Sequence, residues 1–135
     1  MVYGPFSLAG ATAAQLNFRL WLNSELDYDG VCGIASVNGT NFYGTCISGN
    51  TGGWSNQTLD LSNVDTLGNL LGQPNVWVAL VFTSDFSVTF SEGGYVDNIV
   101  LRKCTGGTCT GLNVSAPELD PGQVVEFQTV RTRPR

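Results

Sequence analysis

The stretch from Asn23 to Gly30 holds the side chains best suited to chemistry, because Glu25, Asp27 and Asp29 place three carboxylates at alternate positions. Carboxylates held close together repel one another unless a positive charge lies between them. Calcium meets that need, since it takes about six to eight oxygen ligands from carboxylates, amides and backbone carbonyls. The alternative is a solvated acidic turn that binds nothing. The residues of this stretch leave both interpretations open.

A second candidate site lies on the run that leads into this turn. Between residues 15 and 23, apolar residues alternate with polar ones, and the alternation puts Trp21 on the polar face beside Asn17 and Arg19. A flat aromatic ring flanked by amide and guanidinium groups suits a sugar, which presents an apolar face and a rim of hydroxyls. Trp21, Asn17 and Arg19 are therefore candidate ligand-binding residues, together with Tyr28 in the acidic turn.

The competing interpretation of every aromatic residue is packing, which is the commoner role in a strand-rich chain. Trp54 and Tyr95 lie near predicted loops and are further candidates for ligand contact. Packing is favoured for Trp54 and for Trp77. For Trp21 both interpretations stay open.

Catalysis is poorly supported by the sequence. The chain has no His, which excludes a Ser-His-Asp triad and a His-ligated metal. Glycoside hydrolysis needs only two carboxyl groups at a set separation, and such a pair could be chosen among Glu25, Asp29, Glu92 and Asp97. A small sandwich has little room for a substrate cleft, and a cation would occupy the same acids. We therefore expect no enzymatic activity.

The four cysteines are locally spaced, and three pairings of them are possible. We favour Cys32–Cys46 and Cys104–Cys109, because each pair would close across its own turn, where opposed side chains of two strands meet. A zinc site is disfavoured, since the chain lacks His and the C-x2-C spacing. Disulfides form in oxidising compartments, so we expect a secreted or cell-surface protein.

Other whole-chain features narrow the possible partners. The net charge of −5 argues against nucleic acid as a partner. No apolar run approaches the roughly 20 residues of a membrane-spanning helix. The start of the chain does not have the form of a signal peptide, because Met1 leads almost directly into Tyr3-Gly4-Pro5. We expect an excised domain, or a mature chain with an added Met.

The elements that must position these residues are strands. Hydrophobic residues make up 42% of the chain and charged residues only 13%, and Gly is abundant, whereas long helical periodicity is missing. These features predict an all-β fold, an antiparallel β-sandwich of jelly-roll type. Strands are expected at residues 15–23, 31–37, 42–47, 54–61, 75–83, 86–90, 95–102 and 124–130.

The segments between the strands complete the predicted layout. Residues 1–14 read as a lead-in, residues 63–74 as one helical turn or a packed crossing loop, and residues 110–122 as turn-like. The strand at 75–83 is apolar on both faces, which predicts a central place in its sheet. We expect one domain over 1–135, with a core at about 4–102, a disulfide turn and loop at 103–122, and a terminal strand and basic tail at 123–135.

Three parts of the chain together resemble a known kind of domain. They are residues 4–30 with Gly-Pro-Phe-Ser-Leu-Ala-Gly-Ala-Thr at their start, residues 53–62, and residues 76–99 with Gly-Tyr-Val-Asp-Asn-Ile at their end. In this order they resemble the noncatalytic jelly-roll domains, similar to MAM domains, that lie beside secreted bacterial peptidases of the immune-inhibitor-A type. The resemblance covers about residues 4–102.

This resemblance implies an extracellular sandwich without an active site and with a structural calcium ion. Carried over by position, the implied calcium ligands are Glu25, Asp29 and Asp97, with Asp27 and Asn98 as further candidates. The cysteines are not part of the family pattern, so the disulfide prediction depends on their spacing alone.

Two functions follow as expectations. The first is recognition of an extracellular ligand, either a glycan or another cell-surface component. The second is assembly with other copies into a filament, a surface layer or an adhesin, through pairing of the strand at 124–130 with another sheet edge. Asn-x-Thr/Ser triplets begin at Asn38, Asn56 and Asn113 and would accept glycans in a suitable host.

Overall fold

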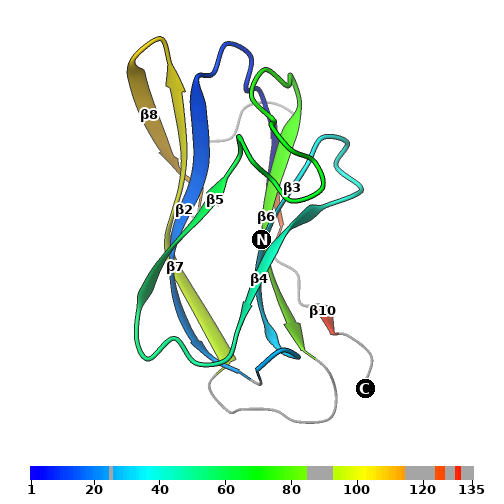
Figure 1. Ribbon diagram of the computed structural model, residues 1–135, viewed down its shortest axis with the longest axis vertical. Helices are drawn as coiled ribbons and strands as arrows, with labels where there is room; N and C mark the ends of the chain where they lie inside the picture. The colour runs from blue at the N-terminus through cyan, green and yellow to red at the C-terminus, as the bar shows by residue number, and fades with distance from the viewer. Residues whose placement is uncertain (25, 85–92, 115–123, 127–129, 132–135) are drawn as a thin grey trace.

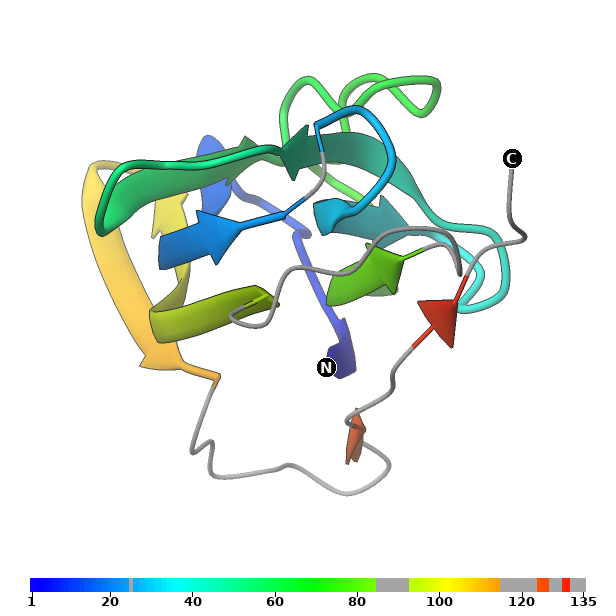
Figure 2. The same cartoon turned by 90° about the horizontal axis from the view of Figure 1, so that it is seen from below.

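The computed structural model describes residues 1–24, 26–84, 93–114, 124–126 and 130–131, and the described chain forms two β-sheets that face each other (Figures 1 and 2). The strands are β1 (Val2–Phe6), β2 (Ala13–Asn23), β3 (Gly30–Ser36), β4 (Tyr43–Ser48), β5 (Ser55–Asp60), β6 (Val76–Ser84), β7 (Gly93–Thr105), β8 (Thr108–Asn113), β9 (Val124–Glu126) and β10 (Val130–Arg131).

The strand order confirms the predicted sandwich. Sheet A has the order β4-β3-β6-β1-β9, and sheet B has the order β5-β2-β7-β8. From β1 to β7 the chain crosses to the other sheet at every connection except the β3–β4 hairpin, which is the connectivity expected of a jelly roll. Among the described strands, every pairing is antiparallel except that of β10, which runs parallel to the end of β6. The strand β6 lies between β3 and β1, as its apolar faces predicted.

Alternation along the strands builds the core between the sheets. On β2 the inward side chains are almost fully buried: Leu16, Phe18, Leu20 and Leu22. Facing residues of β6 are equally enclosed: Val76, Val78 and Leu80. Burying a side chain of this size stabilises the fold by about 1.5–3 kcal/mol, so the inward face of β2 fixes which of its residues point outward.

The segment between β5 and β6 is a packed crossing loop, which was one of the two forms predicted for it. Leu61, Val64 and Leu70 are buried in the core, and the backbones of Val64 and Gly68 form an isolated bridge. A helix does not form there because Thr66 and Gly68 have φ values of 71° and 75°, which lie in the left-handed region.

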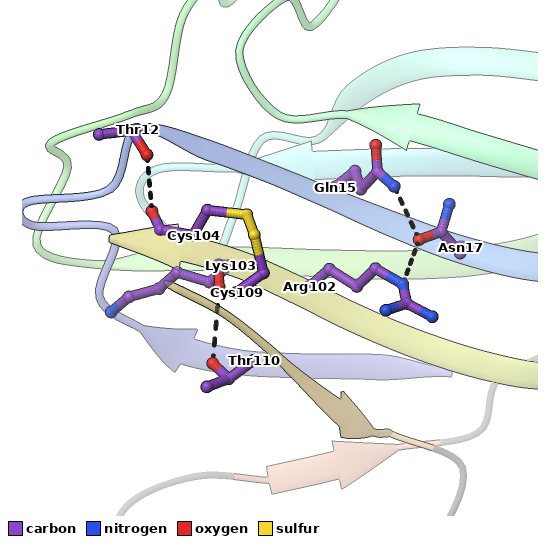
Figure 3. The surroundings of a disulfide bond; sticks show 8 residues. All are labelled: Thr12, Gln15, Asn17, Arg102, Lys103, Cys104, Cys109 and Thr110. Atoms are coloured by element: carbon purple, nitrogen blue, oxygen red, sulfur yellow. Dashed lines mark hydrogen bonds between the residues drawn. A yellow bond between two sulfur atoms is a disulfide. The ribbon is translucent and has the colours of Figure 1, made fainter. Parts of the chain in front are cut away.

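Both predicted disulfides are present. Cys32 lies opposite Cys46 in the β3–β4 pairing, and Cys104 lies opposite Cys109 in the β7–β8 pairing. The Cys104–Cys109 bridge closes the hairpin drawn in Figure 3. Each bridge therefore joins two neighbouring strands of one sheet, as the local spacing predicted.

Three predictions about the ends of the fold need correction or completion. Residues 1–14 are not only a lead-in, because β1 pairs with β6 and with β9. Residues 110–113 are not a turn, because they belong to β8 at the edge of sheet B. The terminal strand predicted at 124–130 is present as β9 and β10, both paired within the chain. The strand predicted at 86–90 lies outside the described residues.

Candidate functional site

The outer face of sheet B gathers polar and aromatic side chains from three neighbouring strands. The central strand β2 contributes every second residue, because its other residues fill the core. Register then decides the neighbours: Arg19 pairs with Asn56 on β5 and with Asp97 on β7, and Trp21 pairs with Tyr95. We call this surface the polar face; its residues are Gln15, Asn17, Arg19, Trp21, Trp54, Asn56, Thr58, Tyr95, Asp97, Asn98, Val100 and Arg102.

One end of the polar face is aromatic. Trp21 and Tyr95 meet edge to face, with their ring centroids 5.6 Å apart and their planes at 63°. The guanidinium carbon of Arg19 lies 5.5 Å from the ring centroid of Trp54. Trp54 is 47% exposed and Tyr95 is 53% exposed, so Trp54 is not a core residue, contrary to the packing role favoured from sequence. Edge-to-face pairs and cation–π contacts of this kind fix the orientation of the rings that they involve.

Amide side chains organise the rest of the face, and Asn17 is at their centre (Figure 3). Its Oδ1 accepts hydrogen bonds from Gln15 Nε2 at 3.0 Å and from Arg102 Nε at 3.1 Å. Its Nδ2 donates to Thr58 Oγ1 at 2.9 Å. Asn17 therefore joins β5, β2 and β7 across the face, and its bond with Arg102 uses the Nε and not the terminal nitrogens of the guanidinium.

The polar face is hollowed between these groups. The hollow has a volume of about 450 Å³ and is lined by residues of β2, β5 and β7. A bulge in β7 lies beside it, because Asn17 pairs with Val100 whereas Arg19 pairs with Asp97, so β7 carries one extra residue. Asn98 has a φ of 51° at this bulge and lines the hollow.

The acidic turn between β2 and β3 forms a separate hollow at the end of sheet A. Ser24 anchors the turn: its hydroxyl donates to the carbonyl oxygen of Asp29 at 2.8 Å and accepts from the backbone N–H of Gly49 at 3.1 Å. Asp27 has a φ of 67°, and its backbone N–H donates to Ser48 Oγ at 2.9 Å. The hollow, about 310 Å³, is lined in part by Asp27, Asp29 and Ser48. Asp29 is buried, and Glu25 lies outside the described residues.

The described residues among the implied calcium ligands lie in these two places. Asp97 lies opposite Arg19, four residues before the end of β2, which corresponds to about 13 Å of strand. Within the described ranges, no three His, Cys, Asp or Glu side chains gather into a group that could hold a metal. Asp97 and Asn98 thus belong to the polar face. Among the described residues, the acidic side chains at the turn are those of Asp27 and Asp29.

The candidate ligand residues are divided in a similar way. Trp21, Asn17 and Arg19 lie together on the polar face, whereas Tyr28 lines the hollow at the acidic turn. Sequence reasoning did not single out Gln15 and Arg102, which complete the polar face. Alternation on β2 already grouped Gln15 with Asn17, but the register of β7, which places Arg102, is not visible in the sequence.

No protein family, curated protein or solved structure matches the chain in the comparisons. The resemblance proposed from sequence is therefore supported only at the level of an all-β sandwich of two sheets, and no family is identified. Among the described residues, no helix is long and apolar enough to cross a membrane. The two disulfides indicate an oxidising environment such as the cell exterior.

Proposed function

We propose that this protein is a noncatalytic extracellular module that binds carbohydrate on its polar face. The observation that carries the proposal is the grouping of Trp21, Tyr95 and Trp54 around Arg19, beside the amide network of Asn17. Trp54 and Tyr95 are about half exposed, so their ring surfaces remain available to a ligand.

The chemistry of the face suits a sugar in two respects. The apolar C–H face of a pyranose ring packs on an aromatic ring, which removes apolar area from water on both partners. The hydroxyls of the ring then need donors and acceptors, and Gln15, Asn56 and Thr58 supply both kinds.

Preorganisation favours affinity at this face. Asn17 is held by three hydrogen bonds, two that it accepts and one that it donates. Arg19 is held over Trp54. Side chains that are already ordered lose less conformational entropy when a ligand binds, so more of the contact energy remains as affinity.

A structural calcium ion is the second part of the proposal, and it is assigned to the acidic turn alone. Asp27 and Asp29 line one hollow, the Ser24 hydroxyl links the Asp29 carbonyl to the Gly49 N–H, and the Asp27 N–H donates to Ser48 Oγ. Carboxylate oxygens are ligands that calcium prefers. When bound, the ion would neutralise the acidic turn and fix the connection between sheet B and sheet A.

The test of carbohydrate binding is a glycan array followed by polysaccharide affinity measurements on purified protein. Trp21→Ala should raise the Kd at least about tenfold, which corresponds to about 1.4 kcal/mol of binding free energy, because it removes one ring of the aromatic pair. The matched control is Tyr43→Ala on β4 of sheet A, where the ring is 37% exposed but lies on the other sheet.

Circular dichroism of both variants checks that they fold. Equal affinities for wild type, Trp21→Ala and Tyr43→Ala would contradict binding at the polar face. Large particles in light scattering without retention of any glycan would instead favour assembly, the second function expected from sequence.

A further inference from the structure

The positive charge of this protein is concentrated in few places. The sequence has six Lys and Arg residues against eleven Asp and Glu residues. Two of the six, Arg19 and Arg102, line the hollow on the polar face, and no Asp or Glu of the described residues lines it. A chain with a net charge of −5 therefore presents a locally cationic hollow at the surface proposed for ligand binding.

Neighbouring side chains position the guanidinium groups of Arg19 and Arg102, and these contacts do not use all of the guanidinium N–H donors. Arg102 uses its Nε to bond Asn17, which leaves the N–H groups of its two terminal nitrogens. The guanidinium carbon of Arg19 lies over the Trp54 ring, 5.5 Å from its centroid, and a cation–π contact is electrostatic and needs no hydrogen bond from the guanidinium. A planar guanidinium with an available edge binds a carboxylate through two parallel hydrogen bonds.

The nearest acidic residues on the same sheet are bonded to their own backbone neighbours. Asp97 Oδ1 accepts from the N–H of Asn98 at 2.8 Å. Asp60 Oδ1 accepts from the N–H of Ser62 at 2.9 Å and from its hydroxyl at 2.7 Å. Each of these carboxylates thus has a local hydrogen-bond partner, and neither residue is part of the hollow's lining.

We propose that the hollow binds an acidic sugar, one that carries a carboxylate as uronic acids do, with Arg19 and Arg102 as the residues that select the charge. This inference rests on the proposed carbohydrate binding and names the class of glycan. Asn17 acts as a positioning residue, since it orients Arg102 through the Nε hydrogen bond. The hydroxyls of the sugar bind the amide groups that share the lining.

The test uses titration calorimetry with a short galacturonate oligomer, compared with the same oligomer after chemical reduction of its carboxyl groups. Wild type should bind the carboxylate form at least about tenfold more tightly, the loss expected when charge-assisted hydrogen bonds are removed. Arg19→Gln and Arg102→Gln should each lower affinity for the carboxylate form about tenfold and leave affinity for the reduced form nearly unchanged.

The matched control is Lys103→Gln. It removes one positive charge from the neighbouring position on β7, but the Lys103 ammonium donates to the Ser7 carbonyl at 3.1 Å, away from the polar face. This variant should bind like wild type. If Lys103→Gln weakens binding as much as the Arg variants, net charge rather than the hollow selects the ligand, and the proposal is wrong.

Further arms separate this inference from the proposed function. Sulfated dextran tests the sulfate, the other common anionic group of glycans. Tighter binding to sulfated dextran than to the galacturonate oligomer would overturn the choice of carboxylate.

Each titration is repeated with chelator. Loss of binding in chelator would show that calcium, and not Arg19 and Arg102, links the oligomer to the protein. Equal affinity for both oligomer forms, with loss in Trp21→Ala, would overturn the acidic-sugar inference and leave carbohydrate binding intact. Absence of binding to every glycan would overturn both.

Discussion

The two disulfides should contribute unequally to stability, and their loop lengths set the difference. Cys32–Cys46 closes a loop with a sequence separation of 14, and Cys104–Cys109 closes one with a separation of 5. A cross-link restricts the unfolded chain more when the loop that it closes is longer. Chain-entropy scaling gives about 3 kcal/mol for the first bridge and about 2 kcal/mol for the second.

The perturbation is a pair of double variants, Cys32→Ala/Cys46→Ala and Cys104→Ala/Cys109→Ala, which leave no unpaired thiol. Urea unfolding followed by tryptophan fluorescence gives the free energy of unfolding of each variant and of wild type. We expect the Cys32/Cys46 variant to lose more stability, by about 0.9 kcal/mol, than the Cys104/Cys109 variant. Cys32 is also buried, so its replacement by Ala adds a small packing loss in the same direction.

Two outcomes would refute this reasoning. The first is an equal or larger loss in the Cys104/Cys109 variant, which would mean that strain or packing in the hairpin outweighs loop closure. The second is a clear change in the m-value of either variant, because the comparison requires that the unfolded states expose similar surface. Wild type treated with reductant should match the stability of a protein that lacks both bridges.

Two further predictions concern the acidic turn and the β3–β4 pairing. Added calcium should raise the Tm of wild type and of Asp97→Asn but not that of Asp29→Asn, because Asp29 lies in the turn proposed to hold the ion. Differential scanning calorimetry in calcium and in chelator measures these Tm values. A calcium response that is lost in Asp97→Asn and kept in Asp29→Asn would contradict the assignment. Gly44→Ala should lower the free energy of unfolding by about 1–3 kcal/mol, because a Cβ there would collide with the carbonyl oxygen of Gly33. Gly111→Ala is the control and should cost less, since the atom closest to its Cβ is the side-chain Val100 Cγ1 at 3.1 Å. Equal urea midpoints for the two variants would contradict this prediction and would mean that the backbone of β3 moves to accommodate the methyl group.

The fold could be predicted where a local pattern carried the information. Alternation identified β2 and its buried face, and cysteine spacing identified both bridges, because each depends on residues close in sequence. The first strand was missed because Gly4-Pro5 interrupts its pattern: Pro has no N–H to donate, and the pairing of β1 with β6 is irregular between Tyr3 and Phe6. The eighth strand was missed because Thr, Gly and Asn make up much of it, and Gly and Asn are typical of turns.

The sequence predicted only those residues of the candidate site that lie on a single strand, β2. Trp21, Arg19 and Asn17 share a face of β2 by alternation alone. Arg102 and Tyr95 join them through the register of β7, which depends on contacts between distant parts of the chain. The same register places Asp97 opposite Arg19 on the polar face, whereas Asp27 and Asp29 line the hollow at the acidic turn.

The bulge in β7 makes the polar face sensitive to insertions and deletions in this strand. Before the bulge, odd-numbered residues such as Tyr95 point outward; after it, even-numbered residues such as Arg102 do. The extra residue thus shifts the alternation of inward and outward side chains by one position along β7. Deleting Asn98 would restore a single phase and turn either the Tyr95 half or the Arg102 half of the strand toward the core. A change of length by one residue in this part of β7 would therefore move either the aromatic or the cationic half of the site away from the polar face.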